Sequence, residues 1–385
     1  MPRLTFRYDG RAATDRGAVA PLVAVLLAAG VLLGMGAWVV DLGLAYAERG
    51  QVVNAAGAAA LAAAEHCVQP GSRTCGQPGA VQAVADANAH DGQMSIDTLC
   101  GVDRLGDQLN RCAAASGGGA AQCLTAAPTG VSYVEVHAGT RTADGKSVLP
   151  PVFSQGAGPH VGGCARVAWG PPRGPYAGIG LSDCAFKATT DGIGDAAGFQ
   201  APPPKNIPDA SVEHVIPLET PGGPGDDTCD DVVYYAADGN CRRQVDPNTQ
   251  ITGWVNPVAG GTPPPGCAQL VRDKEVASYA DPQPYLLMPI YSGYARDQVE
   301  ADGKTTFRIV GIAAFRVTGD KLTADPPAGD VLDHSLSADD FCRAPATSAT
   351  RCIRGYFVWA HIIDGRMPAT GWTTNYGVAA YKTVG

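Results

Sequence analysis

Uncharged apolar residues form one unbroken run near the start of the chain, at residues 18–40 (AVAPLVAVLLAAGVLLGMGAWVV). At 1.5 Å per residue, a helix of this length crosses a hydrocarbon core of about 30 Å. Four arginines precede the run and one follows it closely: Arg3, Arg7, Arg11, Arg16 and then Arg49. Because loops rich in Lys and Arg stay on the cytoplasmic side, we expect a single-pass membrane protein with a cytoplasmic N-terminus and an extracytoplasmic C-terminal domain.

A cleaved signal peptide is the alternative interpretation of this run. The residues AYA at 45–47 have the small-x-small pattern that a signal peptidase recognises. The apolar core of a signal peptide is roughly 7 to 15 residues long, however, and this run is longer. The pattern therefore favours an uncleaved anchor.

An alanine-rich stretch, QVVNAAGAAALAAAEHC at residues 51–67, follows the apolar run. Alanine is the strongest helix former, so we expect one continuous helix over residues 18–65, about 70 Å long, with roughly half of it outside the bilayer as a stalk. The small side chains suit close packing, either on the protein's own ectodomain or on another subunit. Bulky residues at Ala58 and Ala62 would disturb assembly only in the second case.

Gly30 and Gly34 form a GxxxG pattern inside the apolar run. Small residues at this spacing let two membrane helices approach closely, so these glycines are candidates for membrane-helix packing. The alternative is chance, because glycine is common in membrane helices.

Farther along the chain, the pattern of apolar positions changes from helical to extended. Residues 80–92 (AVQAVADANAHDG) are typical of a helix that ends at glycine, whereas β-branched and aromatic residues dominate later segments. The predicted strands lie at 131–138, 285–291, 305–317, 355–363 and 376–384. Proline runs at 200–205 and 260–266 are expected to be linkers or surface loops, and residues 208–266 between them carry few strand signals.

The predicted fold class is therefore α+β: a single N-terminal transmembrane helix that continues into an Ala-rich stalk, followed by a disulfide-rich, mostly β ectodomain. The expected regions are a basic cytoplasmic tail, the membrane helix with its stalk, a Cys-containing helical subregion and a β-rich extracytoplasmic domain. They span residues 1–17, 18–66, 67–130 and 131–385, respectively.

Residues 16–64 closely resemble the N-terminal segment of TadG-like proteins of the Flp pilus (tight adherence) assembly system. The matching features are Arg-Gly before the apolar run, VVDLG at 39–43, Tyr46, and QVVNAAGAAALAAA at 51–64, in which Gly57 replaces the usual Asp. Segments at 164–172, 181–186, 307–319 and 351–358 also look like parts of actinobacterial TadE/G-like proteins.

This resemblance implies a membrane-anchored structural or interaction component of pilus assembly or secretion. Its partners would be the membrane and other pilus-assembly or pseudopilin subunits, and it would carry no established catalysis. Related pseudopilins are cut after a Gly that is followed by a Glu at the fifth position, whereas Gly17 is followed there by Leu22. The resemblance thus favours an unprocessed anchor.

Composition narrows the classes of partner. The net charge of −9 over 385 residues, without clusters of Lys and Arg, argues against a nucleic-acid partner. The 49 Gly and 30 Pro residues indicate long loops between short strands.

The chain has twelve well-separated cysteines and no C-x-x-C pair, which in an exported chain favours disulfides over a zinc site. Connectivity cannot be deduced from the sequence, but short loops suggest four pairs. These candidates are Cys67 with Cys75, Cys164 with Cys184, Cys229 with Cys241, and Cys342 with Cys352.

Two short motifs are candidate metal sites. DHSLS at 333–337 matches the D-x-S-x-S of von Willebrand A domains, but few apolar residues precede it, so a turn or helix N-cap is favoured. GDDTCDD at 225–231 offers oxygen ligands for calcium but lacks EF-hand spacing, so a solvated acidic loop is favoured.

No nucleophile elbow, phosphate-binding loop or zinc-binding histidine pair occurs in the sequence. We therefore expect no enzyme, no cofactor and no small-molecule substrate. A surface adhesin or binding protein, with a groove lined by Trp169, Trp254 and Trp372, is the first alternative. A secreted hydrolase with a dispersed catalytic site is the second.

Overall fold

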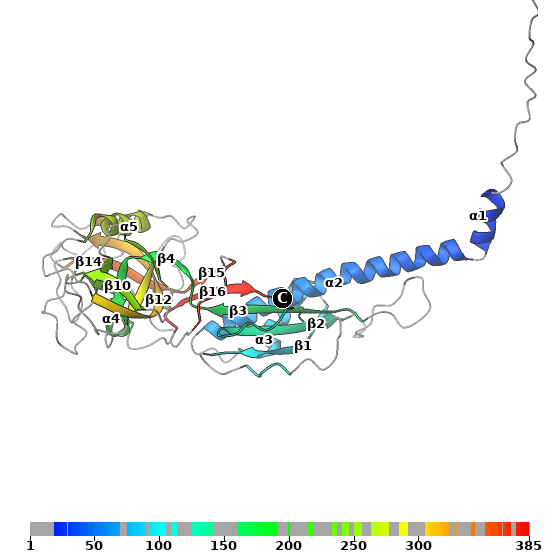
Figure 1. The fold of residues 1–385 in the computed structure, drawn as a ribbon, viewed down its shortest axis with the longest axis horizontal. Helices are drawn as coiled ribbons and strands as arrows, with labels where there is room; N and C mark the ends of the chain where they lie inside the picture. Colours follow the sequence, from blue (N-terminus) through cyan, green and yellow to red (C-terminus); the bar gives the residue numbers. More distant parts are fainter. Residues whose placement is uncertain are drawn as a thin grey trace, which may run out of the picture.

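A long helical rod leads into two β-sheets in the computed structural model (Figure 1). The structure describes residues 19–28, 30–69, 75–89, 93–104, 109–113, 123, 125–141, 152, 160–190, 199–200, 214–218, 233–236, 241–245, 250–255, 263–276, 285–291, 305–322, 328–329, 340–342, 351–363, 365–370 and 375–384. The α+β class, the β-rich body and the presence of disulfides are confirmed.

The rod consists of two helices, α1 (Val19–Ala28) and α2 (Val31–Val68). The expected continuous helix over residues 18–65 is wrong, because Gly30 adopts a left-handed conformation (φ 68°) between them. Only glycine enters this region without steric cost, so the break falls at the residue that allows it. Among the described residues, no helix is long and apolar enough to cross a membrane.

Helix α2 ends where the sequence changes from alanine to a proline-containing turn. Gln69 caps the helix with extended backbone (ψ 124°), as a residue before proline prefers, and Pro70 follows it in the sequence. A disulfide between Cys67 and Cys75 then ties the helix end to the start of α3 (Pro78–Ala87), which has its proline at the first helical position.

A five-stranded sheet, which we call the helix-bound sheet, packs against the C-terminal half of α2 and against α3 (Figure 1). Its strand order is β1-β2-β3-β16-β15, from β1 (Met94–Val102), β2 (Ser132–Thr140), β3 (Gly162–Gly170), β16 (Val378–Thr383) and β15 (Ala360–Ile362). All neighbours are antiparallel except β15 and β16, which are parallel.

This sheet corrects two expectations about regions. Strand β1 lies inside residues 67–130, which were predicted to be helical, and pairs along its whole length with β2. The last strand of the chain, β16, returns to pair with β3, so residues 131–385 are divided among three sheets, one of which has only two strands. Because β3 and β16 are far apart in the sequence, no local sequence pattern predicts that they pair.

A nine-stranded mixed sheet, which we call the distal sheet, lies at the end of the molecule opposite the rod (Figure 1). Its main path is β10 (Gln250–Val255), β8 (Val233–Ala236), β5 (Ile179–Ser182), β11 (Leu286–Tyr291), β12 (Thr305–Lys321), β14 (Cys352–Val358) and β6 (Phe199–Gln200). β13 (Ala328–Gly329) pairs with β12, and β7 (His214–Pro217) pairs with β14.

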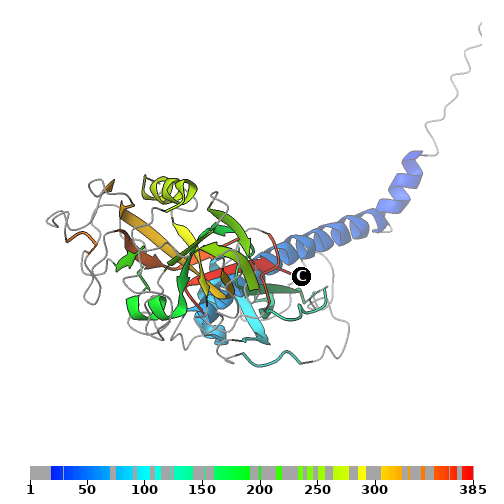
Figure 2. The same cartoon turned by 60° about the vertical axis from the view of Figure 1, so that its left-hand side comes forward.

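Residues 208–266, expected to hold few strands, contribute four of them. These are β7, β8, β10 and β9 (Arg242–Val245), the last of which pairs with β4 (Gly174–Ala177). Two helices, α4 (Asp183–Thr189) and α5 (Pro265–Val276), flank the distal sheet (Figure 2). The strands are only four to six residues long, which is why their periodicity is weak.

An apolar interface joins the two sheets. Val378 and Ala380 of β16 share one buried cluster with Ile312 and Val358 of the distal sheet. The ring of Tyr376 lies over Gly311, where a Cβ would not fit, and its hydroxyl donates to the Asp183 carboxylate at 2.9 Å. The sheets therefore form one continuous body.

Two of the four suggested disulfides are confirmed, and two are wrong. Cys67 is bonded to Cys75 and Cys342 to Cys352, but Cys164 is bonded to Cys123 and Cys241 to Cys267. A further disulfide joins Cys100 to Cys112.

Position in the fold explains the two wrong pairs. Cys164 lies on β3 of the helix-bound sheet, whereas Cys184 lies in α4 beside the distal sheet. Cys241 is tied instead to the first turn of α5, and its suggested partner, Cys229, is outside the described residues. Closeness in sequence was therefore a poor guide where strands separate neighbouring cysteines.

Candidate functional site

The first part of the rod exposes apolar side chains all around its surface. In α1, Val19, Leu22 and Val25 are each more than 60% exposed. In the first turns of α2, Met35, Trp38 and Val39 are 65–67% exposed. A soluble surface rarely leaves such a dense apolar patch uncovered, so this part of the rod is built to be covered by lipid or protein.

The second part of α2 is covered by the protein itself. Its buried face consists of small residues at helical spacing, which contact Val134 and Val136 of β2 and Val167 and Trp169 of β3. The buried residues are Val52, Ala55, Ala56, Ala59, Ala60, Ala63, Ala64 and Cys67. The alanine-rich stretch therefore packs on its own ectodomain.

Gly163 on β3 allows this close approach. A Cβ placed on Gly163 would lie 2.9 Å from the Cγ1 of Val52 and 3.2 Å from the backbone nitrogen of Val53. Real Cβ atoms do not come so close, so the helix rests directly on the strand at this point.

The opposite face of the same helical stretch remains available. Asn54 is exposed, and Ala58 is half-buried. Ala62 is also half-buried but packs against the helix-bound core, so it belongs partly to the fold. Of the two positions suggested for bulky substitution, Ala58 is the one that probes a second partner.

Asp41 marks the transition between the two parts of α2. It is the first charged residue after the apolar run, and its carboxylate accepts a hydrogen bond of 3.0 Å from the backbone nitrogen of Val152. Ala45, one turn farther, is the first residue of α2 that packs against the helix-bound core. The body of the protein thus contacts the rod from Asp41 onward.

The other end of α2 is fixed by contacts to the end of the chain. Asn375 donates to the carbonyl of Val68 at 2.7 Å, and Glu65 lies 3.6 Å from His361. Burial, together with the charge of Glu65, raises the pKa of the Tyr381 hydroxyl, so this tyrosine stays neutral below the helix. These contacts join α2 to β15, β16 and the segment between them.

The two glycines of the GxxxG pattern have different roles. Gly30 forms the break between helices, and its carbonyl accepts from the backbone nitrogen of Gly34 at 2.7 Å. A Cβ added to either residue would meet no atom within 4 Å, so neither packs against another part of this chain. Packing between membrane helices at these glycines stays a prediction.

A buried ionic network lies on the sheet face that turns away from α2. The Arg166 guanidinium makes two hydrogen bonds to one carboxylate oxygen of Glu135, and the other oxygen lies 2.6 Å from His137 Nε2. Arg166 also donates to the carbonyl of Thr125 at 2.9 Å. Because both charges are buried and paired, the network fixes the segment around Thr125 onto the sheet.

Two groups of potential metal ligands occur among the described residues, and both include Glu135. One contains Cys100 and His137, and the other contains Cys123 and Cys164. All three cysteines are in disulfides, so their sulfur atoms are not the thiolates that bind zinc. These groups are better explained as the ionic network and its two neighbouring disulfides.

The remaining sequence candidates do not meet in one place. Trp169 is fully buried beneath α2, so it cannot line the surface groove suggested for an adhesin. Trp254 lies in β10, and Trp372 is outside the described residues. The motifs at 225–231 and 333–337 also lie outside them, so both metal hypotheses stay predictions.

Comparison with known proteins identifies the rod. Residues 17–66 match the model of the Flp pilus-assembly TadE/G-like family, which confirms the resemblance recognised at residues 16–64. The match covers α1 and nearly all of α2, whereas both sheets lie outside it. No curated protein and no solved structure matches the chain.

Proposed function

We propose that this protein is a membrane-anchored structural and interaction component of a Flp pilus assembly or secretion system. The observation that carries the proposal is the coincidence of the TadE/G-like match with a helix of two parts. One part is apolar and uncovered, and the other is the core helix of the protein's own sheet.

In this proposal, α1 and the first turns of α2 lie in the membrane. The run over residues 18–40 has no charge, and arginines precede it, which supports a cytoplasmic N-terminus with the sheets outside. Within lipid, backbone N–H and C=O groups must bond inside the segment, and at the break the Gly34 N–H bonds to the Gly30 carbonyl.

Assembly would use the outward face of α2 above the membrane. Asn54 and Ala58 face away from the helix-bound sheet, next to the part of the helix that enters lipid. A neighbouring pilus-assembly subunit that contacts this face would continue the helix packing that begins in the membrane. No catalytic step is part of the proposal.

The test compares Ala58→Leu with the parent in cells that assemble Flp pili. Leucine at this half-buried position should leave the fold intact and reduce both surface pili and co-purification of partner subunits by about tenfold, because a tightly packed contact loses 1–3 kcal/mol on overpacking. Pili are counted by electron microscopy, and partners are quantified after cross-linking.

Two controls separate assembly from folding. Ala59→Leu, at a fully buried position, should unfold the helix-bound sheet and lower the amount of protein, whereas Ala58→Leu should not. A deletion strain must lose pili or secretion. Normal pili in the deletion strain, or normal partner recovery with Ala58→Leu, would refute the proposed role.

A further inference from the structure

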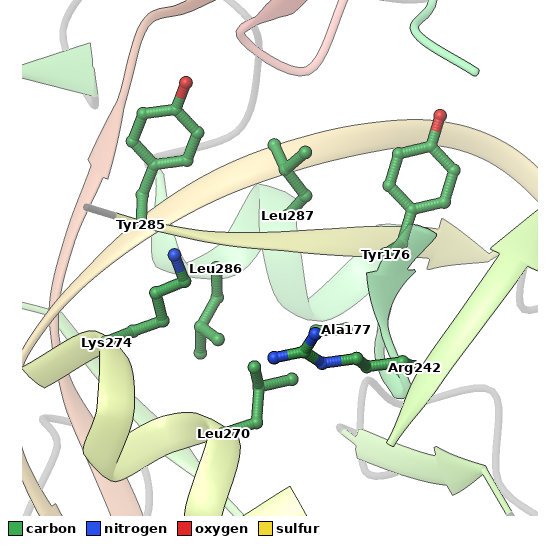
Figure 3. A pocket seen from close by; sticks show the side chains of 8 residues that line it. All are labelled: Tyr176, Ala177, Arg242, Leu270, Lys274, Tyr285, Leu286 and Leu287. Carbon is green, nitrogen blue, oxygen red and sulfur yellow. The ribbon is translucent and has the colours of Figure 1, made fainter. Parts of the chain in front are cut away.

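A small pocket opens on the distal part of the molecule, between α5, β4, β11 and the start of β9 (Figure 3). Its volume is about 140 Å³. Four aliphatic residues form its walls, and two tyrosines and two cations complete the lining. The lining residues are Ala177, Leu270, Leu286, Leu287, Tyr176, Tyr285, Arg242 and Lys274.

A disulfide holds three walls of the pocket together. Cys241, directly before Arg242, is bonded to Cys267 in the first turn of α5. The carbonyl of Cys241 accepts from the backbone nitrogen of Gly178 at 2.6 Å, one residue after Ala177. The disulfide and this hydrogen bond therefore fix Arg242, α5 and the end of β4 relative to one another, so the walls of the pocket are held in place by the fold.

The charge in the pocket is opposite to that of the chain. Arg242 and Lys274 project from facing walls, with Leu270 and Leu286 between them (Figure 3). No acidic residue is among the described residues of the lining, although the whole chain carries a net charge of −9. Two cations above an aliphatic floor attract an anion that carries an apolar group.

The described part of the chain supplies no ion pair for Arg242. Arg242 is an exposed residue, whereas Leu286 is 1% exposed. A planar guanidinium binds a carboxylate with two parallel hydrogen bonds. An exposed cation beside buried aliphatic side chains suits a carboxylate with an adjoining aliphatic side chain.

We propose that this pocket binds the C-terminal residue of a partner polypeptide, with its carboxylate between Arg242 and Lys274 and an aliphatic side chain against Leu270 and Leu286. The proposal goes beyond the anchoring role and does not depend on it, because the pocket lies on the body far from the rod.

The size of the pocket favours this ligand over others. Sites for cofactors and drug-sized molecules occupy about 300–1,000 Å³, and this pocket is smaller, so it suits one residue. A free phosphate would leave the aliphatic floor unfilled, and a sugar would place hydroxyl groups against leucine side chains without hydrogen-bond partners.

The test uses the full-length chain in detergent micelles with labelled leucine methyl groups, followed by NMR. The probe is acetyl-Ala-Ala-Leu with a free carboxylate, compared with the same peptide as a C-terminal amide and with inorganic phosphate. The free acid should shift the methyl signals of Leu270 and Leu286, and the amide should bind at least tenfold more weakly.

Single substitutions test whether the free-acid peptide binds in the pocket. Arg242→Gln and Lys274→Gln should each weaken binding of the free acid about tenfold, which corresponds to 1.4 kcal/mol. Arg272→Gln, which removes an exposed cation from the same helix outside the pocket, is the matched control and should bind like the parent. Circular dichroism of each variant verifies the fold.

Four results would overturn the proposal. The first is equal binding of the acid and the amide, and the second is phosphate that shifts these methyl signals while the peptide does not. The third is a loss with Arg272→Gln as large as that with Arg242→Gln. Absence of any saturable shift would overturn it as well.

Discussion

Gly163 is the residue that decides how closely α2 approaches its sheet. The side chain of Val52 occupies the space where a β-carbon of residue 163 would be. Along the helix, alanine occupies six of the buried positions between Val52 and Cys67. Small residues on both surfaces thus act together, and substitution on either side has to push the helix away.

Gly163→Val should therefore lower the free energy of unfolding by about 1–3 kcal/mol, because it overpacks this contact. Thermal unfolding of the purified chain, followed by circular dichroism, measures the loss. Gly57→Ala on the same helix is the matched control: no atom lies within 4 Å of the added Cβ, and alanine favours the helix by about 1 kcal/mol. Equal stability of Gly163→Val and the parent would mean that the helix does not press on β3.

Residue pairs brought together by strand register could not be predicted from the sequence. Glu135 and Arg166 face each other across β2 and β3, and Cys164 faces His137 two pairs farther along. Nothing in the spacing of these residues along the chain encodes this register. The same limit explains why Cys164 was assigned to Cys184, the next cysteine along the sequence, although its true partner is Cys123.

At the scale of elements, α2 is a single helix in two environments. Its sequence predicted helix throughout, because alanine and leucine dominate it and the apolar run has no charge. The sequence also contained the buried face, as small residues at three- and four-residue spacing from Val52 to Cys67. The covering sheet was not predictable, because its central strands are far away in the sequence.

The break at Gly30 is the element-scale feature that the sequence did not predict. Glycine is tolerated inside a helix and equally permits a left-handed turn, so a lone glycine does not decide between the two. Substitution with alanine disfavours the left-handed conformation by roughly 1–2 kcal/mol and so favours a continuous helix.

We predict that Gly30→Ala straightens the rod at this break. Spin labels at Val23 and Val40, in protein reconstituted into nanodiscs, should lie roughly 26 Å apart in Gly30→Ala, as 17 residues of continuous helix require, and closer together in the parent. Equal distances in the two proteins would contradict the prediction.

At the scale of the whole molecule, the rod, the helix-bound sheet and the distal sheet follow one another in a line (Figure 1). The sequence predicted a helical start and a β-rich remainder joined by disulfides, and most of the expected strands occur. It did not predict the division into two sheets, because β16 at the end of the chain completes the first sheet rather than the second. Contacts between the ends of a chain leave no periodic pattern.

The order of these parts along the molecule determines where the proposed contacts would lie relative to the membrane. The apolar interface around Tyr376 and Gly311 joins the two sheets, so a rod fixed in the membrane would hold the distal sheet and its pocket away from the bilayer. A partner bound at the pocket and a subunit packed on α2 would then occupy different parts of the molecule.

Membrane topology in intact cells tests the central claim most directly. Protease is added to spheroplasts that carry an epitope tag at each end of the chain. We predict that the C-terminal tag is lost, that a small N-terminal fragment with its tag is protected, and that this fragment stays in the membrane pellet after alkaline extraction. A protected C-terminal tag, or release of the intact chain from the membrane by alkali, would contradict the account.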